Sequence, residues 1–496
     1  MSSLEDGNYW PSGETVRQFH LSDDFFRVLM GPFGSGKTVG CSLECYKAAC
    51  LAAPDRNGVR RSRNAIIRNR ISDLEATTVK TWNEVFESRF GKVRGAPTGG
   101  GFVARWLFGI PEDGTTVDAE FRFFPFDTQR DIKRLLGSEY TSAFLNEVRE
   151  LPPSLMNVLP GRLRYPKPGI LADGYEPKHF IIADTNPPDL GHWLHKAFES
   201  DEEPPEGWKL FRQPPGVIKR QGKWVPNPDA DNVQNLHRNY YPQAIAGQPE
   251  DVIRVNYGNE YGYIKAGKLI VPNFSDHLHV APERLEFDPN IEVIYVGIDF
   301  GSTPAAALLQ EDLNGRWYMI EELISLEKPG IRDFGETVLL PRARELEARG
   351  HTLVFCGDPA GEGTSQTDGE DCFETLAGLG IDAEPAYTNA IGHRGEVVDS
   401  LCRSLSDGVP RFQVSPSCKV TIQGLAQKYV YEQVNEADDP RDIRYRDRPK
   451  KDGNAFSHIC DGVGYGIMGS GYGEDFLVDR RRSRHGPIEY KRRYNG

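Results

Sequence analysis

The 496-residue sequence lacks any long apolar run. Hydrophobic residues make up 38% of the chain, and no apolar stretch approaches the length of about 18 residues that a membrane-spanning helix requires. The first ten residues, MSSLEDGNYW, also lack the basic and then apolar pattern of a secretory signal. We therefore expect neither a membrane span nor a secretory leader.

Paired cysteine motifs are absent as well. The chain has eight cysteines but no Cys-x-x-Cys pair, and only Cys41 and Cys45 share a face of a predicted helix. This spacing favours reduced thiols and argues against a structural zinc site. The net charge of −13 argues against a protein coated in nucleic acid, although it permits a local basic channel.

The length of the chain exceeds what one ordinary core contains, so two or three domains are expected. Its most informative stretch runs from Phe25 to Ala53. Residues 25–30 are apolar and predict a buried strand, GPFGSGKT follows, and a segment with helical spacing begins at Thr38. Strand, glycine-rich loop and helix in this order are typical of a phosphate-binding P-loop. The residues expected to bind ATP through this loop are Gly31, Gly34, Ser35, Gly36, Lys37 and Thr38.

Each part of this loop has a chemical reason to be there. Glycines let backbone N–H groups turn inward around phosphate oxygens, and the helix N-terminus adds partial positive charge. Lys37 is expected to reach the β- and γ-phosphates, and the Thr38 hydroxyl is expected to hold Mg²⁺. Gln18 is a candidate for reading adenine, and an exposed glutamine without a role is the alternative.

A second apolar strand, residues 141–145, ends in Asn146 and Glu147 and has the form of a Walker B site. We expect Glu147 to orient and polarise the attacking water. The usual pair is Asp-Glu, so we expect Asn146 to help Mg²⁺ less directly. Glu150 is interpreted as a solvated neighbour of this site.

Two further segments of the N-terminal half have interpretable patterns. Residues 179–184 predict a buried strand that runs into Thr185 and Asn186. A polar pair at such a strand end can sense hydrolysis, and a simple turn is the alternative. The alternating segments 102–110 and 117–126 surround turn residues and predict a hairpin.

A new α/β pattern begins at Ile291, after a proline-punctuated stretch that we interpret as a linker subdomain. One strand ends in Asp299 and opens a predicted three-strand meander, and a later strand ends in Asp358. A helix near the C-terminus carries Asp461. Two strand-end acids and one helical acid are the ribonuclease H-like arrangement, with Glu321 as a candidate fourth acid.

Clustered carboxylates repel one another, so a pair of Mg²⁺ or Mn²⁺ ions about 4 Å apart would neutralise these acids and activate a water for phosphodiester attack. Taken singly, each acid is more simply interpreted as a cap or a solvated side chain. The hypothesis depends on all three meeting in the fold.

With these motifs in place, the chain resembles the large terminase subunit of tailed bacteriophages over about residues 9–472. The segments that carry the resemblance are residues 31–38, 135–150, 185–193, 297–301, 357–361 and 457–461. The resemblance implies an α/β chain with a P-loop ATPase domain over 1–199, a linker subdomain over 200–288 and a ribonuclease H-like nuclease domain over 289–473. A basic tail, 474–496, would follow.

The resemblance also implies roles. Lys37 and Thr38 match the Walker A pair, and Asn146 with Glu147 matches Walker B. The remaining matches are Thr185 and Asn186 to the coupling motif, and Asp299, Asp358 and Asp461 to the nuclease acids. Such a protein would hydrolyse ATP to move double-stranded viral DNA into a procapsid and cut concatemeric DNA, with Mg²⁺ or Mn²⁺ at both sites.

The implied partners are the portal protein, the small terminase subunit and further copies of the chain in a ring, usually of five. The implied location is the host cytoplasm, with transient docking on the procapsid, and the basic tail would dock on the portal protein. An arginine from a neighbouring copy would complete each ATP site. Arg134 is the favoured candidate because it precedes the Walker B strand, and Arg130 and Arg68 are the alternatives.

Two other hypotheses stay open at this point. A helicase or remodelling ATPase would use the C-terminal half to bind DNA without cutting it, but it would need further helicase motifs and a second motor-like domain. A nucleotide-gated structural adaptor would not need Glu147. Asn146 favours the adaptor slightly, and the intact Glu147 argues against it.

Overall fold

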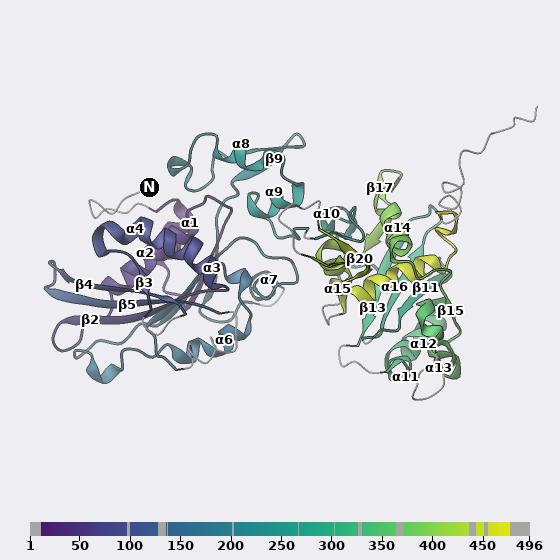
Figure 1. The fold of residues 1–496 in the computed structure, drawn as a ribbon, viewed down its shortest axis with the longest axis horizontal. Coiled ribbons are helices and arrows are strands. Elements are labelled where there is room, and N and C mark those ends of the chain that lie inside the picture. The colour runs from purple at the N-terminus through teal and green to yellow at the C-terminus, as the bar shows by residue number, and fades with distance from the viewer. Residues whose placement is uncertain are drawn as a thin grey trace, which may run out of the picture. The chain divides into compact units, whose positions relative to one another are not determined.

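The computed structural model describes the chain in several ranges. These are residues 11–96, 100–126, 135, 137–200, 203–265, 267–301, 303–325, 330–363, 371–435, 443–450 and 455–476. The chain divides into two compact units, Met1–Gly262 and Tyr263–Gly496 (Figure 1). The expected linker subdomain, 200–288, is thus shared between the two units. Among the described residues, no helix combines the length and the apolar character needed to cross a membrane.

The first unit is built on an eight-stranded sheet with the order β3-β4-β5-β2-β6-β7-β1-β8. From β5 to β8 in this order all neighbours are parallel, whereas β3, β4 and β5 pair antiparallel. The strands are β1 Phe26–Met30, β2 Val59–Arg68, β3 Arg94–Gly95, β4 Phe102–Ile110, β5 Thr115–Pro125, β6 Ser142–Leu145, β7 Phe180–Thr185 and β8 Trp208–Arg212. The hairpin predicted around residues 111–114 is confirmed by β4 and β5.

The first unit also contains helices and short turns. The helices are α1 Glu14–Leu21, α2 Lys37–Cys50, α3 Ile71–Asp73, α4 Lys80–Phe90, α6 Ser154–Val158, α7 Trp193–Glu199, α8 Tyr240–Ile245 and α9 Glu250–Asn256. A π-helical turn, Leu74–Val79, joins α3 to α4, and 3₁₀ turns span Val148–Glu150, Pro160–Arg162, Pro168–Ile170 and Val233–Asn235. A separate hairpin consists of β9 Val217–Arg220 and β10 Lys223–Pro226.

The central strands are buried on both faces because successive side chains point to opposite sides of a sheet. Leu29 and Ile66 belong to the core that includes α1, α2 and α4. Val28 and Ala65 belong to the core on the other face, which includes α6 and α7. This double covering explains why the strands read as continuous apolar runs in the sequence.

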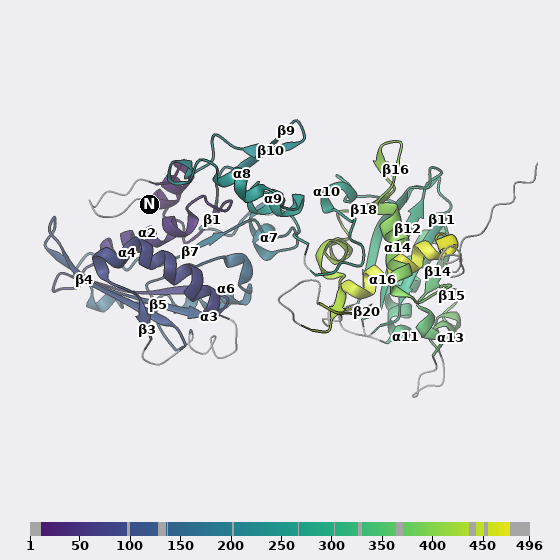
Figure 2. The same cartoon turned by 45° about the horizontal axis from the view of Figure 1, so that its top comes forward.

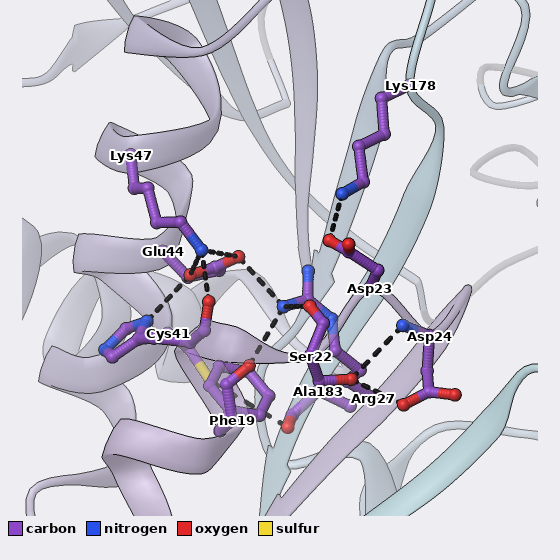
Figure 3. A network of polar contacts seen from close by, with 11 residues as sticks. Phe19, Ser22, Asp23, Asp24, Arg27, Cys41, Glu44, Lys47, Lys178 and Ala183 are labelled. Atoms are coloured by element: carbon purple, nitrogen blue, oxygen red, sulfur yellow. Dashed lines mark hydrogen bonds and ion pairs between the residues drawn. The ribbon is translucent and has the colours of Figure 1, made fainter.

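A buried polar network fixes the P-loop helix to the first strand (Figure 3). Arg27 on β1 donates hydrogen bonds to Glu44 on α2 over 2.9 Å and to the carbonyl of Phe19 over 3.0 Å. His20 and Lys47 also contact the Glu44 carboxylate. Although burial opposes the charge of Glu44, His20 and Arg27 hold its pKa below the ordinary value. The network therefore connects α1, β1 and α2 through buried hydrogen bonds and ion pairs.

The second unit contains a six-stranded sheet with the order β15-β14-β11-β12-β13-β18. The strands are β11 Val293–Asp299, β12 Ala305–Glu311, β13 Trp317–Ile324, β14 Thr352–Gly357, β15 Ala383–Pro385 and β18 Phe412–Val414. The meander of β11, β12 and β13 is antiparallel, as predicted, and β14 adds to β11 in parallel. Three antiparallel strands followed by parallel ones are typical of the ribonuclease H-like fold predicted from the sequence.

Helices cover both faces of this sheet. They are α10 Asp276–His279, α11 Ile331–Phe334, α12 Leu340–Ala348, α13 Cys372–Gly378, α14 Ile391–Cys402, α15 Lys419–Gln423 and α16 Phe456–Met468. Cores with α14, α15 and α16 on one face and with α11, α12 and α13 on the other enclose the strands. Two small ribbons pair β16 Leu405–Ser406 with β17 Val409–Pro410 and β19 Tyr431–Gln433 with β20 Tyr445–Pro449. All eight cysteines are free.

Helix α16 lies directly on the backbone of β11 (Figures 1 and 2). A Cβ atom on Gly297 would fall 1.9 Å from the carbonyl oxygen of Gly462 and 2.2 Å from the amide nitrogen of Gly466. Only glycines permit such an approach of helix and strand. The close packing brings the side chains of α16 to the end of β11.

Candidate functional site

The glycine-rich loop connects β1 to α2 as the sequence predicts. Gly34 and Gly36 both have φ of 81°, a left-handed conformation that favours glycine. The N–H groups of Gly31 and Phe33 donate to the carbonyls of Thr185 and Asn256 and anchor the loop. Residues from Gly34 onward lead into the first turn of α2, where N–H groups lack intrahelical partners and attract anions.

The far side of the loop is held by a segment that follows β8. Gln213 donates to the carbonyl of Ser35 over 3.0 Å, and Asn232 donates to the carbonyl of Gly34 over 2.7 Å. The Ser35 hydroxyl is buried and hydrogen-bonds Gln213, so the Ser35 side chain shapes the loop from within. Sequence reasoning missed Gln213 and Asn232, because no local pattern links residues so distant from the loop.

Lys37 is buried, and its ammonium group donates to the carbonyl of Pro32 over 2.9 Å. Burial lowers the pKa of Lys37, while the nearby carboxylates of Glu147 and Asp184 act to raise it. The lysine therefore lies at the loop, between the loop's own carbonyl and the carboxylates of the neighbouring strands.

Glu147 follows β6 in a left-handed conformation with φ of 50°, which is costly for a residue with a side chain. Within the described residues its buried Oε2 atom accepts no hydrogen bond, and Arg149 lies 3.7 Å from the same atom. Strained backbone and an unsatisfied buried carboxylate oxygen are features of functional sites. The predicted catalytic acid is therefore at the end of β6, close enough to Lys37 to affect its pKa.

Asn146 is 2% exposed and makes hydrogen bonds through both ends of its amide. Its oxygen accepts from Arg68 over 2.8 Å and from Thr78 over 2.5 Å. Its nitrogen donates to Asp184 over 2.8 Å. Arg68 also contacts Glu150 over 3.4 Å, so this arginine, one of three candidates for action in trans, is engaged within its own chain.

Asp184 is a further residue of this site that sequence reasoning missed. It is fully buried near the end of β7 and accepts hydrogen bonds from the Thr38 hydroxyl over 2.6 Å and the Glu147 amide over 2.8 Å. Burial and the nearby Glu147 carboxylate raise its pKa. A strand ending in an acid was the signal used for Asp299 and Asp358, and the same signal is present here.

The expected coupling residues follow Asp184 directly. Thr185 and Asn186 are both fully buried. The carbonyl of Thr185 accepts from the N–H of Gly31 over 3.1 Å, and the Asn186 amide donates to the carbonyl of Asn256 over 3.4 Å. The end of β7 is thus hydrogen-bonded to the first residue of the glycine-rich loop and to the C-terminal end of α9.

Four other predictions have different outcomes. Gln18 lies exposed on α1, and its amide donates a hydrogen bond to Glu14 on the same helix over 2.6 Å. Arg130 and Arg134 lie outside the described residues, as does the tail from residue 477. Glu321 contacts Arg342 on α12 over 2.7 Å and is not among the residues that line the cleft described next.

In the second unit, Asp299, Asp358 and Asp461 line one cleft of about 1320 Å³. The parallel pairing of β11 with β14 places Asp299 and Asp358 at neighbouring strand ends, and α16 adds Asp461 from above the sheet. His458, one turn before Asp461, lies 2.7 Å from Asp299 Oδ1. Basic residues share the cleft, namely Arg394, Lys428, Arg448 and Lys450.

Asp461 is held by Arg394 on α14. The guanidinium lies 2.7 Å from Asp461 Oδ1, and the Tyr429 hydroxyl donates to the same oxygen. Burial raises the pKa of Asp461 to about 6 although Arg394 acts to lower it. Within the described residues, no group of three or more acidic, histidine or cysteine side chains is gathered closely enough to hold a metal ion. The three acids share a cleft, but Asp461 is turned to Arg394.

Comparison with known proteins gives matches among solved structures only. No family model matches the chain, and no curated protein does. The large terminase of the thermophilic bacteriophage D6E is 16% identical, covers 92% of this chain and 98% of its own, and has a TM-score of 0.38.

Two further structures show the same kind of similarity. The large terminase of bacteriophage HK97 is 12% identical over 92% of both chains with a TM-score of 0.34. The ATPase domain of the large terminase of Thermus phage P74-26 is 16% identical over 51% of this chain and 94% of its own, with a TM-score of 0.32. The structures that resemble this chain over nine-tenths of its length include large terminases of tailed phages, the family that its motifs resemble.

Proposed function

We propose that this chain is the large subunit of a terminase, a motor that hydrolyses ATP to move double-stranded DNA into a procapsid and that cuts the DNA. One observation carries the ATPase part of the proposal. Glu147 is held in a strained conformation beside Lys37 and Asp184, with a buried carboxylate oxygen that accepts no hydrogen bond from the described residues.

The roles at the nucleotide site follow from the contacts there. The loop N–H groups from Gly34 to Thr38 and the Lys37 ammonium would bind the phosphates of ATP. Glu147 would orient the attacking water and accept its proton. Thr38, whose hydroxyl lies beside a buried carboxylate, fits a role in holding Mg²⁺, which when bound neutralises charge on the phosphates.

Movement would begin at the end of β7. Thr185 shares a backbone hydrogen bond with Gly31 at the start of the loop. Asn186 contacts the end of α9. A change at the γ-phosphate that shifts the loop would therefore reach α9 through residues that are fully buried and cannot move independently.

The second unit would cut DNA in the cleft lined by the three acids. Lys428, Arg448 and Lys450 would contact the phosphate backbone. Carboxylates are hard oxygen ligands that suit Mg²⁺ and Mn²⁺, so Asp299, Asp358 and Asp461 are the proposed holders of those ions. Because Asp461 is paired with Arg394, the described arrangement is not that of a gathered metal site, and metal-dependent cleavage stays a prediction.

The remaining parts of the proposal follow the family resemblance. They are a ring of five copies on the portal protein, cooperation with a small terminase subunit, and action in the host cytoplasm. Arg134 stays the favoured arginine in trans, because Arg68 is engaged with Asn146 in its own chain.

The test combines two activities and two variants. The purified chain is incubated with plasmid DNA and Mg²⁺ or Mn²⁺, and ATP hydrolysis is measured in parallel. We expect Asp358→Ala to lose cleavage and keep hydrolysis, and Lys37→Ala to lose hydrolysis and keep cleavage. Cleavage that survives in Asp358→Ala would reject the assignment of the cleft. Hydrolysis without any cleavage by the wild type would favour a helicase-like or remodelling ATPase.

A further inference from the structure

The strand β6 carries no carboxylate at the position where a P-loop ATPase uses one beside Mg²⁺. Asn146 occupies that position, and both ends of its amide are already engaged. Its oxygen accepts from Arg68 and Thr78, and its nitrogen donates to Asp184. An uncharged group whose only acceptor atom already receives two hydrogen bonds is a poor partner for a divalent cation.

A carboxylate is present one strand closer to the loop. In the sheet β7 lies between β6 and β1, the strand that leads into the P-loop. Asp184 on β7 pairs in register with Leu29 on β1, two residues before Gly31. Neighbouring strands lie about 4.8 Å apart, so an acid at this position is nearer to Thr38 than an acid at the end of β6 would be.

The contacts of Asp184 agree with this placement. Its Oδ2 atom accepts from the Thr38 hydroxyl, the group expected to hold Mg²⁺, and its Oδ1 atom accepts from the Glu147 amide. Asp184 is fully buried, and its contacts among the described residues are hydrogen bonds from Thr38, Asn146 and Glu147, while Lys37 is nearby but forms no ion pair with it. A buried carboxylate without an ion pair is costly, and a divalent cation beside Thr38 would neutralise it.

We infer that Asp184 on β7 is the carboxylate that works with Thr38 to hold the Mg²⁺ of the bound nucleotide, a role that Asn146, directly after β6, does not take. The inference rests on the proposed ATP hydrolysis. Asn146 becomes a positioning residue, since it is fixed by Arg68 and Thr78 and donates to Asp184. An aspartate at 146 would place a second carboxylate beside Asp184, and the amide avoids that repulsion.

The experiment measures nucleotide binding, not turnover. Fluorescent mant-ADP is titrated into the full chain with Mg²⁺ and with EDTA, and bound Mn²⁺ is followed by its paramagnetic resonance signal in the presence of ADP. In the wild type, Mg²⁺ is expected to tighten nucleotide binding. In Asp184→Asn the metal-dependent tightening should fall by about tenfold or more, while the affinity measured in EDTA should stay unchanged.

A second variant separates a metal role from a structural one. Asn146→Asp combined with Asp184→Asn keeps one amide and one carboxylate in hydrogen-bonding reach, so it protects the fold. The carboxylate now lies beside Arg68, which neutralises it. We expect this exchanged pair to lack the metal-dependent tightening, as Asp184→Asn does. A wild-type level of tightening in Asp184→Asn overturns the inference. Tightening that is lost in Asp184→Asn and returns only in the exchanged pair supports it, because a carboxylate is then needed and residue 184 supplies it in the wild type.

The outcomes also separate this inference from the proposed function. If the wild type binds no mant-ADP, or binds it as weakly as a Lys37→Ala control does, the nucleotide site itself is rejected. If the wild type binds nucleotide with Mg²⁺-dependent tightening and both Asp184 variants do the same, the P-loop assignment stands and only the role of Asp184 fails.

Discussion

Arg394 on α14 lies 2.7 Å from Asp461 on α16, and both side chains are buried at the edge of the acid-lined cleft. The ion pair joins α14 to α16 through two residues that are 67 positions apart in the sequence. Tyr429 donates to the same carboxylate. The acid predicted to act on DNA is thus also a structural partner within the second unit.

Arg394→Gln is expected to lower the free energy of unfolding by about 3 kcal/mol, because it leaves a buried carboxylate without its cation. Denaturant unfolding of the second unit measures this cost. The double variant Arg394→Gln with Asp461→Asn should recover most of the loss, since neither buried charge remains. Equal stability of Arg394→Gln and the wild type would show that the ion pair does not form in solution.

Gly297→Ala is expected to lower the free energy of unfolding of the second unit by about 1–3 kcal/mol or more. The new methyl group would overlap the backbone of α16 at Gly462 and Gly466. Cleavage should be lost as well, since α16 carries Asp461. Gly378→Ala is the matched control, because a Cβ atom there meets nothing within 4 Å. Thermal unfolding of both variants distinguishes close packing from a general effect of replacing glycine.

The sequence predicted those parts of both sites that depend on local order along the chain. A strand, a glycine-rich loop and a helix in succession identify the P-loop. Strands that end in acids identify Asp299 and Asp358. The placement of these residues at strand ends and at a helix start agrees with the structure, because the polypeptide connects the residues involved and their spacing determines which strand end or helix terminus each occupies. Their chemical roles stay predictions.

The contacts between distant residues could not be predicted in this way. Arg68 was a candidate for action in trans, and its bond to Asn146, 78 residues away, depends on the parallel pairing of β2 with β6. Asp184 reaches Thr38 across 146 residues. An isolated sequence offers many acids and arginines, and only the strand order decides which of them meet.

The buried polar network around Glu44 predicts that the stability of the first unit depends on pH. The pKa of Glu44 lies below its ordinary value of 4.5, so its contribution to stability is present above that pH and is lost as the pH falls through the lower, folded-state value. The basic side chains that face it are Arg27, His20 and Lys47. Glu44→Gln should therefore be less stable than the wild type at pH 7.

Unfolding free energies at pH 7, 5 and 4 test this dependence on the first unit. The difference between wild type and Glu44→Gln should stay nearly constant from pH 7 to pH 5 and should shrink below about pH 4.5. Lys47→Gln is a suitable control, because Lys47 is partly exposed and lies 3.4 Å from the carboxylate. A difference that grows as the pH falls would contradict a lowered pKa for Glu44 in the folded protein.

Glu147→Gln should separate nucleotide binding from hydrolysis. The amide keeps the size of the side chain but cannot accept a proton from the attacking water, so we expect kcat for ATP to fall by about 10²–10⁴-fold with nucleotide affinity unchanged. Glu150→Gln is the matched control three residues away. Its carboxylate contacts Arg68 and is partly exposed, so hydrolysis should stay close to that of the wild type. If both variants hydrolyse ATP equally well, the acid that activates the water is not at the end of β6, and the strained conformation of Glu147 would have a structural origin.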